Sequence, residues 1–130
     1  MPRRPGLPTL GGMFVIHHAH LIDRADRTDP ALQAGEQRFC AIGPACGVNA
    51  FQVWMHTLPP GAHTPVQQHH GAFAALALAG SGKLLVNGGP QRFQSPCTLV
   101  VPPGADFQLV NNAAVPLLVV SVFTPALPAA

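Results

Sequence analysis

The stretch HTPVQQHHG, residues 63–71, has the strongest potential for chemistry in this chain. It places His63, His69 and His70 around two glutamines, directly before an apolar run. Imidazole nitrogens are common ligands of transition metals, whereas an amide oxygen is a weak one. The stretch therefore raises the question of a transition-metal site, for which His69, Gln67 and His63 are the candidate ligands.

The remaining histidines, His17, His18, His20 and His56, lie outside this stretch. His18 and His20 form an H-x-H pair in residues 13–22, MFVIHHAHLI, whose apolar and β-branched residues predict a strand with both imidazoles on one face. No third ligand lies near this pair in the sequence, so a metal role for it has little support. We expect His56, on the strand before the HTPVQQHHG stretch, and His63 to lie at the surface or rim.

The other reactive side chains offer few candidates for nucleophilic or acid–base catalysis. The chain has three cysteines and no C-x-x-C spacing, which indicates neither a zinc ribbon nor a disulfide framework. Cys97 has no histidine beside it in the sequence and is expected to be a buried thiol. Asp106 neighbours an inward-facing residue and should point outward, so we do not expect it to pair with a histidine inside the fold.

Strand parity indicates which side chains share an interior. Alternate residues of a strand lie on one face, so if Gln67 and His69 point inward, then His70 points outward. The other inward positions would be Phe73, Ala75, Ala77 and Ala79 on one strand, and Phe107 and Leu109 on a later strand. This predicts a mostly apolar pocket formed by Gln67, His69, Phe73, Ala75, Phe107 and Leu109, suited to a small organic molecule held by one or two hydrogen bonds. The alternative is a barrel filled by its own phenylalanines, with His69 as a core histidine.

The elements that must position these residues are short and frequently interrupted. Fifteen prolines and thirteen glycines in 130 residues argue against long helices. From residue 49 onward, apolar runs of five to ten residues alternate with Pro/Gly turns, which is typical of an antiparallel sandwich or barrel. The expected organisation is a loose arm (1–12), an N-terminal strand with an irregular segment (13–48), a barrel (49–125) and a tail (126–130).

The distribution of charge indicates that the protein pairs with a second copy of itself. Residues 39–130 carry three charged side chains, namely Lys83, Arg92 and Asp106. A monomer normally solvates its surface with many more, so we expect a homodimer that covers part of this surface. The seven Lys/Arg residues form no patch for nucleic acid, and no apolar run has the ~20 residues needed to cross a membrane. With no apolar segment behind the N-terminal arginines, the expected location is the cytoplasm.

Residues 49–125 resemble the cupins, small all-β jelly-roll barrels also described as double-stranded β-helices. The first cupin motif, G-x5-H-x-H-x3-E-x6-G, is matched in spacing by Gly61, Gln67, His69, Phe73 and Gly80. The second, G-x5-P-x-G-x2-H-x3-N, is matched in spacing by Pro96, Pro102, Gly104, Phe107 and Asn111. The resemblance implies a cupin barrel with an N-terminal extension, and cupins of this size commonly pair.

The resemblance also implies where a metal would bind. In metal-binding cupins the two histidines and the glutamate of the first motif, with the histidine of the second, hold the ion. Those positions are Gln67, His69, Phe73 and Phe107 here, so one of the four is a good ligand. The stretch also resembles gentisate-type ring-cleaving dioxygenases, which use three histidines. Two hypotheses remain: a cupin without the standard metal site that binds a small apolar or aromatic molecule or is a structural relic, or a dioxygenase-type enzyme with a non-standard ligand set around His69.

Overall fold

The structure is a computed structural model that describes residues 15–24 and 32–124. The arm expected at residues 1–12 and the tail expected at 126–130 lie outside the described residues.

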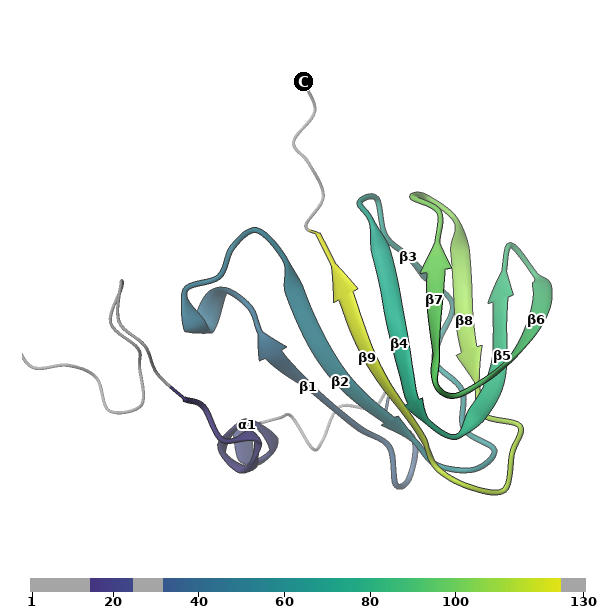
Figure 1. The fold of residues 1–130 in the computed structure, drawn as a ribbon, viewed down its shortest axis with the longest axis horizontal. Helices are drawn as coiled ribbons and strands as arrows, with labels where there is room; N and C mark the ends of the chain where they lie inside the picture. The colour runs from purple at the N-terminus through teal and green to yellow at the C-terminus, as the bar shows by residue number, and fades with distance from the viewer. Residues whose placement is uncertain (1–14, 25–31, 125–130) are drawn as a thin grey trace, which may run out of the picture.

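The described chain folds into two antiparallel sheets that enclose a common core (Figure 1). The five-stranded sheet has the order β1-β2-β9-β4-β7 and the four-stranded sheet has the order β3-β8-β5-β6. The strands of the first sheet are β1 (Gln37–Ile42), β2 (Gln52–Leu58), β9 (Leu117–Phe123), β4 (Phe73–Ala79) and β7 (Cys97–Val101). Those of the second are β3 (Gln67–Gln68), β8 (Asp106–Val110), β5 (Ser81–Val86) and β6 (Gly89–Gln94). A helix, α1 (His18–Arg24), lies beside the β1 edge, and a short 3-10 turn, η1 (Pro44–Cys46), follows β1.

Alternation along the strands builds the core. On β9, Leu117 and Val119 are fully buried, while Leu118 and Val120 between and after them are half-buried on the opposite face. Phe107 of the facing sheet is 1% exposed and packs into the same apolar cluster. The buried residues of both sheets thus form one core, as expected for a two-layer all-β domain.

Gly80 and Asn111, which match the spacing of the two cupin motifs, have structural roles that explain why these residue types are needed. Gly80 joins β4 to β5 with φ +89°, and a Cβ there would lie 2.5 Å from the Pro116 carbonyl oxygen. Only glycine fits such a close approach at a left-handed backbone position. Asn111 is fully buried; its amide donates to the carbonyls of Leu58 and Val115 and its oxygen accepts from the Ala113 N–H. Asn111 therefore holds the strand ends together.

The strand predicted at 13–22 is wrong for the described part of that segment. Residues 15–17 have no regular structure and His18–Arg24 form a helix. In this helix the half-buried Leu21 shares one face with His18, whose ring lies 5.2 Å from that of Phe39 on β1. Residues two apart do not face one another on a helix, so the H-x-H geometry of His18 and His20 is lost. Among the described residues, no helix has the length and apolar character needed to cross a membrane.

Two further differences from the sequence-based expectations concern the strands. β1 lies inside the segment that the sequence predicts to be irregular, and it extends the five-stranded sheet at its edge. Parity predicts that Ala79 faces inward, but it is exposed, because the β4–β9 register shifts between Ala77 and Ala79. An irregularity of this kind reverses the side of every residue that follows it.

Candidate functional site

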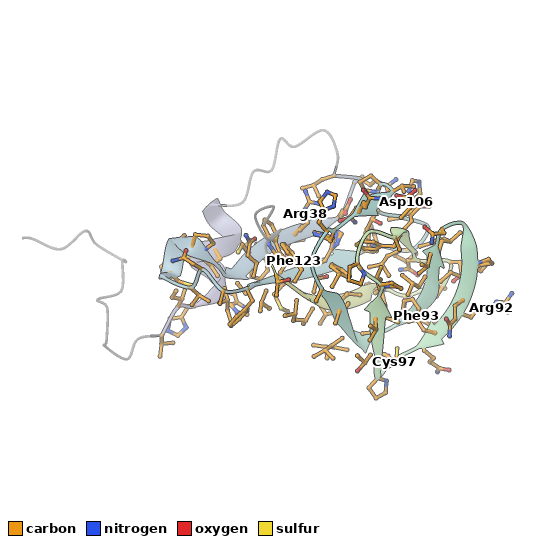
Figure 2. All side chains as sticks on the ribbon, turned by 90° about the horizontal axis from the view of Figure 1, so that it is seen from above. Arg38, Arg92, Phe93, Cys97, Asp106 and Phe123 are labelled. Atoms are coloured by element: carbon orange, nitrogen blue, oxygen red, sulfur yellow. The ribbon has the colours of Figure 1, made fainter. Side chains whose placement is uncertain are left out.

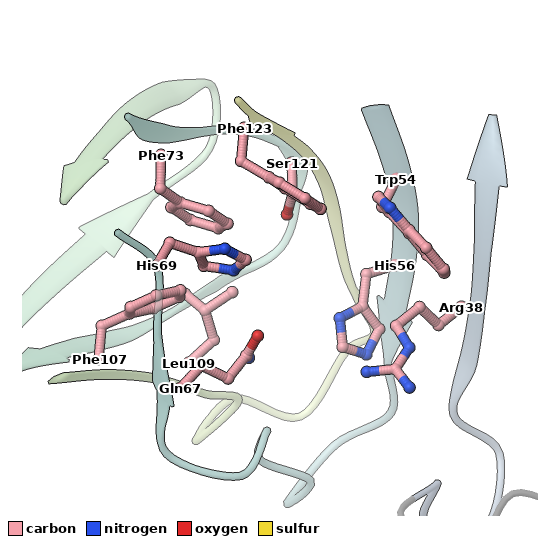
Figure 3. A pocket seen from close by; sticks show the side chains of 10 residues that line it. All are labelled: Arg38, Trp54, His56, Gln67, His69, Phe73, Phe107, Leu109, Ser121 and Phe123. Atoms are coloured by element: carbon pink, nitrogen blue, oxygen red, sulfur yellow. The ribbon is translucent and has the colours of Figure 1, made fainter. Parts of the chain in front are cut away.

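A cavity of about 180 Å³ lies between the two sheets (Figure 3). Strands of both sheets contribute to it, together with the segment that follows β3. Its lining residues are Arg38, Trp54, His56, Gln67, His69, Phe73, Phe107, Leu109, Ser121 and Phe123.

One side of the cavity, which we call the aromatic wall, consists of His69, Phe73, Phe107 and Phe123. The ring centre of His69 lies 5.0 Å from that of Phe73, 5.7 Å from that of Phe107 and 4.5 Å from that of Phe123. Figure 3 shows the imidazole between the Phe73 and Phe107 rings. These separations are those of interacting aromatic pairs. The His69 imidazole is therefore packed as one ring of an aromatic cluster.

Strand pairing and one backbone hydrogen bond place this wall. Phe73 lies opposite Phe123 across the β4–β9 pair, and Phe107 lies opposite Gln67 across the β8–β3 pair. The Gly104 N–H donates to the His69 carbonyl at 2.8 Å, from a backbone with φ +79°. This bond holds the segment after β3 against the turn before β8, and so fixes the backbone position of His69.

Three polar groups of the lining face the open space. The His69 ring, the Gln67 amide and the Ser121 hydroxyl have no hydrogen-bond partner among the described residues. Within that same part of the chain, every side-chain nitrogen or oxygen that is sealed from solvent does have one. The polar atoms of these three side chains are therefore reachable through the cavity.

Burial lowers the pKa of the His69 imidazole below the ordinary histidine value, and electrostatic repulsion from the neighbouring His70 lowers it further, which favours the neutral ring. A neutral imidazole offers one N–H donor and one nitrogen acceptor.

The opposite side is lined by Arg38, Trp54 and His56. Together with Glu36, which contacts His56 without lining the cavity, we call these residues the polar wall. Trp54 and His56 alternate on β2 and so share its inner face, and Arg38 on β1 lies directly opposite His56. The Arg38 guanidinium carbon is 5.9 Å from the centre of the Trp54 ring, within the range of a cation–π contact. Figure 3 shows the side chains of Arg38, Trp54 and His56 across the cavity from His69.

A buried acid–base pair lies at the back of the polar wall. The Glu36 carboxylate contacts Nε2 of His56 through its Oε2, and the His56 and Glu36 side chains are 7% and 2% exposed respectively. The Glu36 Oε1 accepts the backbone N–H of Gln33 at 2.9 Å. Burial lowers the pKa of His56 and Arg38 lowers it further, while the hydrogen bond and the charge of Glu36 oppose that shift.

The donor set does not fit the transition metal that the cupin motif implies. All four motif positions line the cavity, but they supply one imidazole, one amide and two phenyl rings. His63, the reserve ligand, is exposed and lies outside the lining; Gln108 bonds to its Nδ1 at 3.2 Å. In the described chain, no three His, Cys, Asp or Glu side chains gather where they could hold an ion.

The structure brings together five of the six residues predicted to form the pocket: Gln67, His69, Phe73, Phe107 and Leu109. Ala75 is 1% exposed and belongs to the apolar core, because its short side chain does not reach the cavity. The expectations that His63, His70 and Asp106 face outward are confirmed by their exposure. Figure 2 shows Arg92 pointing away from the barrel, while Phe123 lies inside it.

The prediction that His56 lies at the surface or rim is wrong, since it is 6% exposed and lines the cavity. Both faces of β2 are apolar enough that parity alone does not identify the inner one. Glu36 and Arg38 were missed because the sequence predicts an irregular segment there, although Arg38 and Phe39 already alternate in polarity. Ser121 and Phe123, on the last strand, were missed as well.

Comparison with known proteins supports the fold. No protein-family profile matches the chain, and no curated protein matches its sequence. Among solved structures, it is similar to the polyketide cyclase RemF from Streptomyces resistomycificus (TM-score 0.73, 16% identity, 91% of this chain and 83% of that one). It is also similar to a Cupin 2 conserved barrel domain protein from Salinispora arenicola (TM-score 0.66, 22% identity); the match covers 88% of this chain and 91% of that one. A salicylate 1,2-dioxygenase from Pseudoaminobacter salicylatoxidans, in complex with gentisate, matches over 72% of this chain and 26% of that one (TM-score 0.63, 18% identity).

Proposed function

Starting from the cupin fold of this chain, we propose that the protein binds a small planar organic molecule, of the size of one aromatic ring, between the aromatic and polar walls. The observation that carries the proposal is the set of polar groups, on His69, Gln67 and Ser121, that face the cavity beside its aromatic rings and have no hydrogen-bond partner in the described part of the chain. Pockets for small molecules combine such apolar surfaces with a few directed polar groups.

The size of the cavity limits the ligand. An engineered protein cavity of about 150 Å³ lined by apolar side chains binds benzene. At about 180 Å³, the cavity here has room for one ring with small substituents. A filled barrel, the alternative, would leave no such space beside the Phe73 and Phe107 rings.

The polar groups favour a ligand that carries a hydrogen-bonding substituent. The Gln67 amide can both donate and accept, and so can the His69 ring in its neutral form, which its lowered pKa favours. The likeness to a dioxygenase that binds gentisate, a one-ring aromatic acid, makes aromatic acids reasonable probes, although it establishes only the fold. The present residues do not supply that class of enzyme with its three histidines.

Trp54 provides the readout, since it is the only tryptophan of the chain and lines the cavity. We expect benzoate, salicylate or gentisate to change its fluorescence saturably. Gln67→Leu should weaken binding about 5-fold, because one hydrogen bond is worth about 1 kcal/mol and 1.4 kcal/mol is a factor of ten. His70→Gln, at an exposed neighbouring position, is the matched control. If none of these acids changes the fluorescence or raises the melting temperature, the ligand proposal fails.

The proposal includes that the pocket works without a resident metal. Mass spectrometry of untagged, mildly dialysed protein should find no stoichiometric iron, manganese, nickel, copper or zinc. Stoichiometric metal that disappears in His69→Ala would instead support the alternative, a metal-dependent enzyme with a non-standard ligand set.

We also propose that the protein is a homodimer that pairs through the outer face of the five-stranded sheet. The outward positions of β2, β9, β4 and β7 hold apolar residues and threonines and no charge; they are Val53, Met55, Thr57, Leu118, Val120, Val122, Ala74, Leu76, Thr98 and Val100. Leu76 is 43% exposed and Val100 is 70% exposed. A sheet normally presents a polar side to water, and a two-fold axis would place this uncharged face against itself.

Light scattering at micromolar concentration tests the dimer. It should give twice the 13.6 kDa mass of one chain. Val100→Glu should lower that mass toward the monomer, whereas Gln91→Glu, exposed on β6 of the other sheet, should not. A monomeric wild-type protein would contradict the proposal.

A further inference from the structure

The Glu36–His56 pair is more than the binding of a small molecule requires. Removing two ionisable groups from water costs several kcal/mol per ion, and an apolar pair would close the same space at no such cost. Glu36 is also the only glutamate of the chain, and its carboxylate is 2% exposed. A pair of this kind that opens on a cavity is a candidate for proton transfer.

The hydrogen bonding sets the tautomer of His56. Its Nε2 faces the Glu36 carboxylate, which can only accept, so the neutral ring carries its proton on Nε2. The lone pair is then on Nδ1. This nitrogen has no partner among the described residues, and every sealed polar atom there has one, so Nδ1 is open to the cavity. Figure 3 agrees, with one ring nitrogen of His56 directed to the side of Gln67 and His69.

Glu36 is itself held in place on its other side. The backbone N–H of Gln33 donates to Oε1 of Glu36, and the side-chain oxygen of Gln33 accepts the backbone N–H of His63 at 2.8 Å. The turn closes with a bond from the Glu36 N–H to the Gln33 carbonyl. The carboxylate is therefore oriented by two segments, as the orienting acid of a general base must be.

The ionisable groups around His56 are Glu36 before β1, Arg38 on β1 and, across the cavity, His69 after β3. β9, which pairs with β2 on the other side, contributes Val119 opposite His56 and the neutral Ser121. The cavity thus contains one oriented base and, opposite it, the Gln67 amide, whose N–H can donate to a developing oxyanion.

Building on the proposed ligand site, we propose that His56 is a general base, positioned by Glu36, that moves a proton on a planar carbonyl compound bound in the cavity. Nδ1 takes a proton from the carbon next to the carbonyl. The C–H bond breaks and its electron pair forms the enolate, whose oxygen is stabilised by the Gln67 N–H. His56 then returns the proton to carbon or to oxygen, so the reaction is an isomerisation and needs no oxidant, reductant or metal.

The probe is phenylpyruvate, which joins one aromatic ring to an acidic C–H beside a ketone. In D₂O, the protein should accelerate replacement of the benzylic protons by deuterium, followed by ¹H NMR, while Trp54 fluorescence measures binding in the same samples. The exchange rate should fall as the pH falls through the pKa of His56, because only the neutral ring accepts a proton. Because this pH profile is measured on the wild-type protein, it does not depend on whether any variant folds.

The variants separate catalysis from positioning. His56→Gln should lower the exchange rate of the bound probe about 100-fold, since a general base contributes a factor of 10²–10⁴. Glu36→Gln should lower it about 10-fold and move the inflection of the pH profile to lower pH, because the charge that raises the His56 pKa is gone. His20→Gln, which replaces an exposed histidine of α1 outside the cavity lining, is the matched control and should change neither quantity.

The outcomes distinguish the two proposals. Binding of phenylpyruvate with exchange no faster than in buffer, or with exchange unaffected by His56→Gln, overturns the base and leaves the ligand site standing. No binding of phenylpyruvate or of the aromatic acids overturns both. Exchange that falls in Glu36→Gln with an unmoved pH profile assigns Glu36 a purely structural role and overturns the pair.

Discussion

The two walls of the cavity differ in both chemistry and origin. The aromatic wall includes three of the four positions where metal-binding cupins have their ligands, and two of these three are phenylalanines. The polar wall comes from β1, β2 and the residue before β1, outside both motifs, and has the buried pair Glu36–His56. The comparison teaches that a barrel with few metal ligands on one wall still has titratable groups facing the same space from the other.

The walls should also differ in what they contribute to the folded state. Phe107 and Phe73 are almost fully buried and add apolar contact, which stabilises the barrel. The polar wall buries a charge, which lowers stability unless the partner is present. Changes in the first wall should therefore affect stability, whereas changes in the second should affect proton transfer as well as stability.

The largest expected effect is that of Phe107→Ala. The side chain is 1% exposed, and truncation of a buried phenylalanine costs about 3–5 kcal/mol of unfolding free energy. Urea denaturation measures the loss, with Phe51→Ala, at a 38% exposed position, as the control. Equal losses in the two variants would show that the aromatic wall is not part of the core.

The next effect concerns the pair. His56→Leu should cost about 3 kcal/mol, because it leaves the Glu36 carboxylate buried without its partner. Adding Glu36→Gln to it should recover part of that loss, because the stranded charge is removed. Additive losses in a double-mutant cycle would mean that the two side chains are not coupled.

A smaller effect is expected from pH. Burial lowers the pKa values of His56 and His69 in the folded protein below the unfolded value of about 6.5. Below that pH the unfolded chain binds more protons, so stability is full above about pH 6.5 and is lost as the pH falls toward the folded pKa values. The melting temperature should fall accordingly between about pH 7 and pH 5, and His69→Gln should flatten the decline. An unchanged decline in that variant would assign it to other groups.

The smallest effect is expected for His63→Ala. Its imidazole is exposed and outside the cavity, so stability should change by less than about 0.5 kcal/mol and binding of aromatic acids should be unchanged. Calorimetric titration compares the affinities. A large loss of affinity would bring His63 back as a member of the site.

The fold was predictable because its turns need particular residues. Gly80 lies where two backbone segments approach closely, and Asn111 lies where a buried amide bonds two carbonyls. The spacing of such residues therefore indicates the barrel even though most of the metal-ligand positions hold other residues. The aromatic wall followed from the same spacing together with strand parity.

The polar wall was not predictable by these means. Its members are joined by pairing between β1 and β2, which lie outside the motifs, and the Glu36 carboxylate is held by the Gln33 N–H and by His56. Ala79 was misplaced by a register shift that has no signature in an all-apolar strand. Local patterns specify faces, whereas these features depend on tertiary pairing.

The most direct test of the central claim is calorimetric titration of chelator-treated protein with salicylate, repeated after addition of iron(II), manganese(II) or zinc(II). The account predicts saturable one-to-one binding to the metal-free protein, with an affinity that metal does not change and that Gln67→Leu weakens. Binding that appears only after metal is added, or no binding in either state while the other aromatic acids also fail, would contradict it.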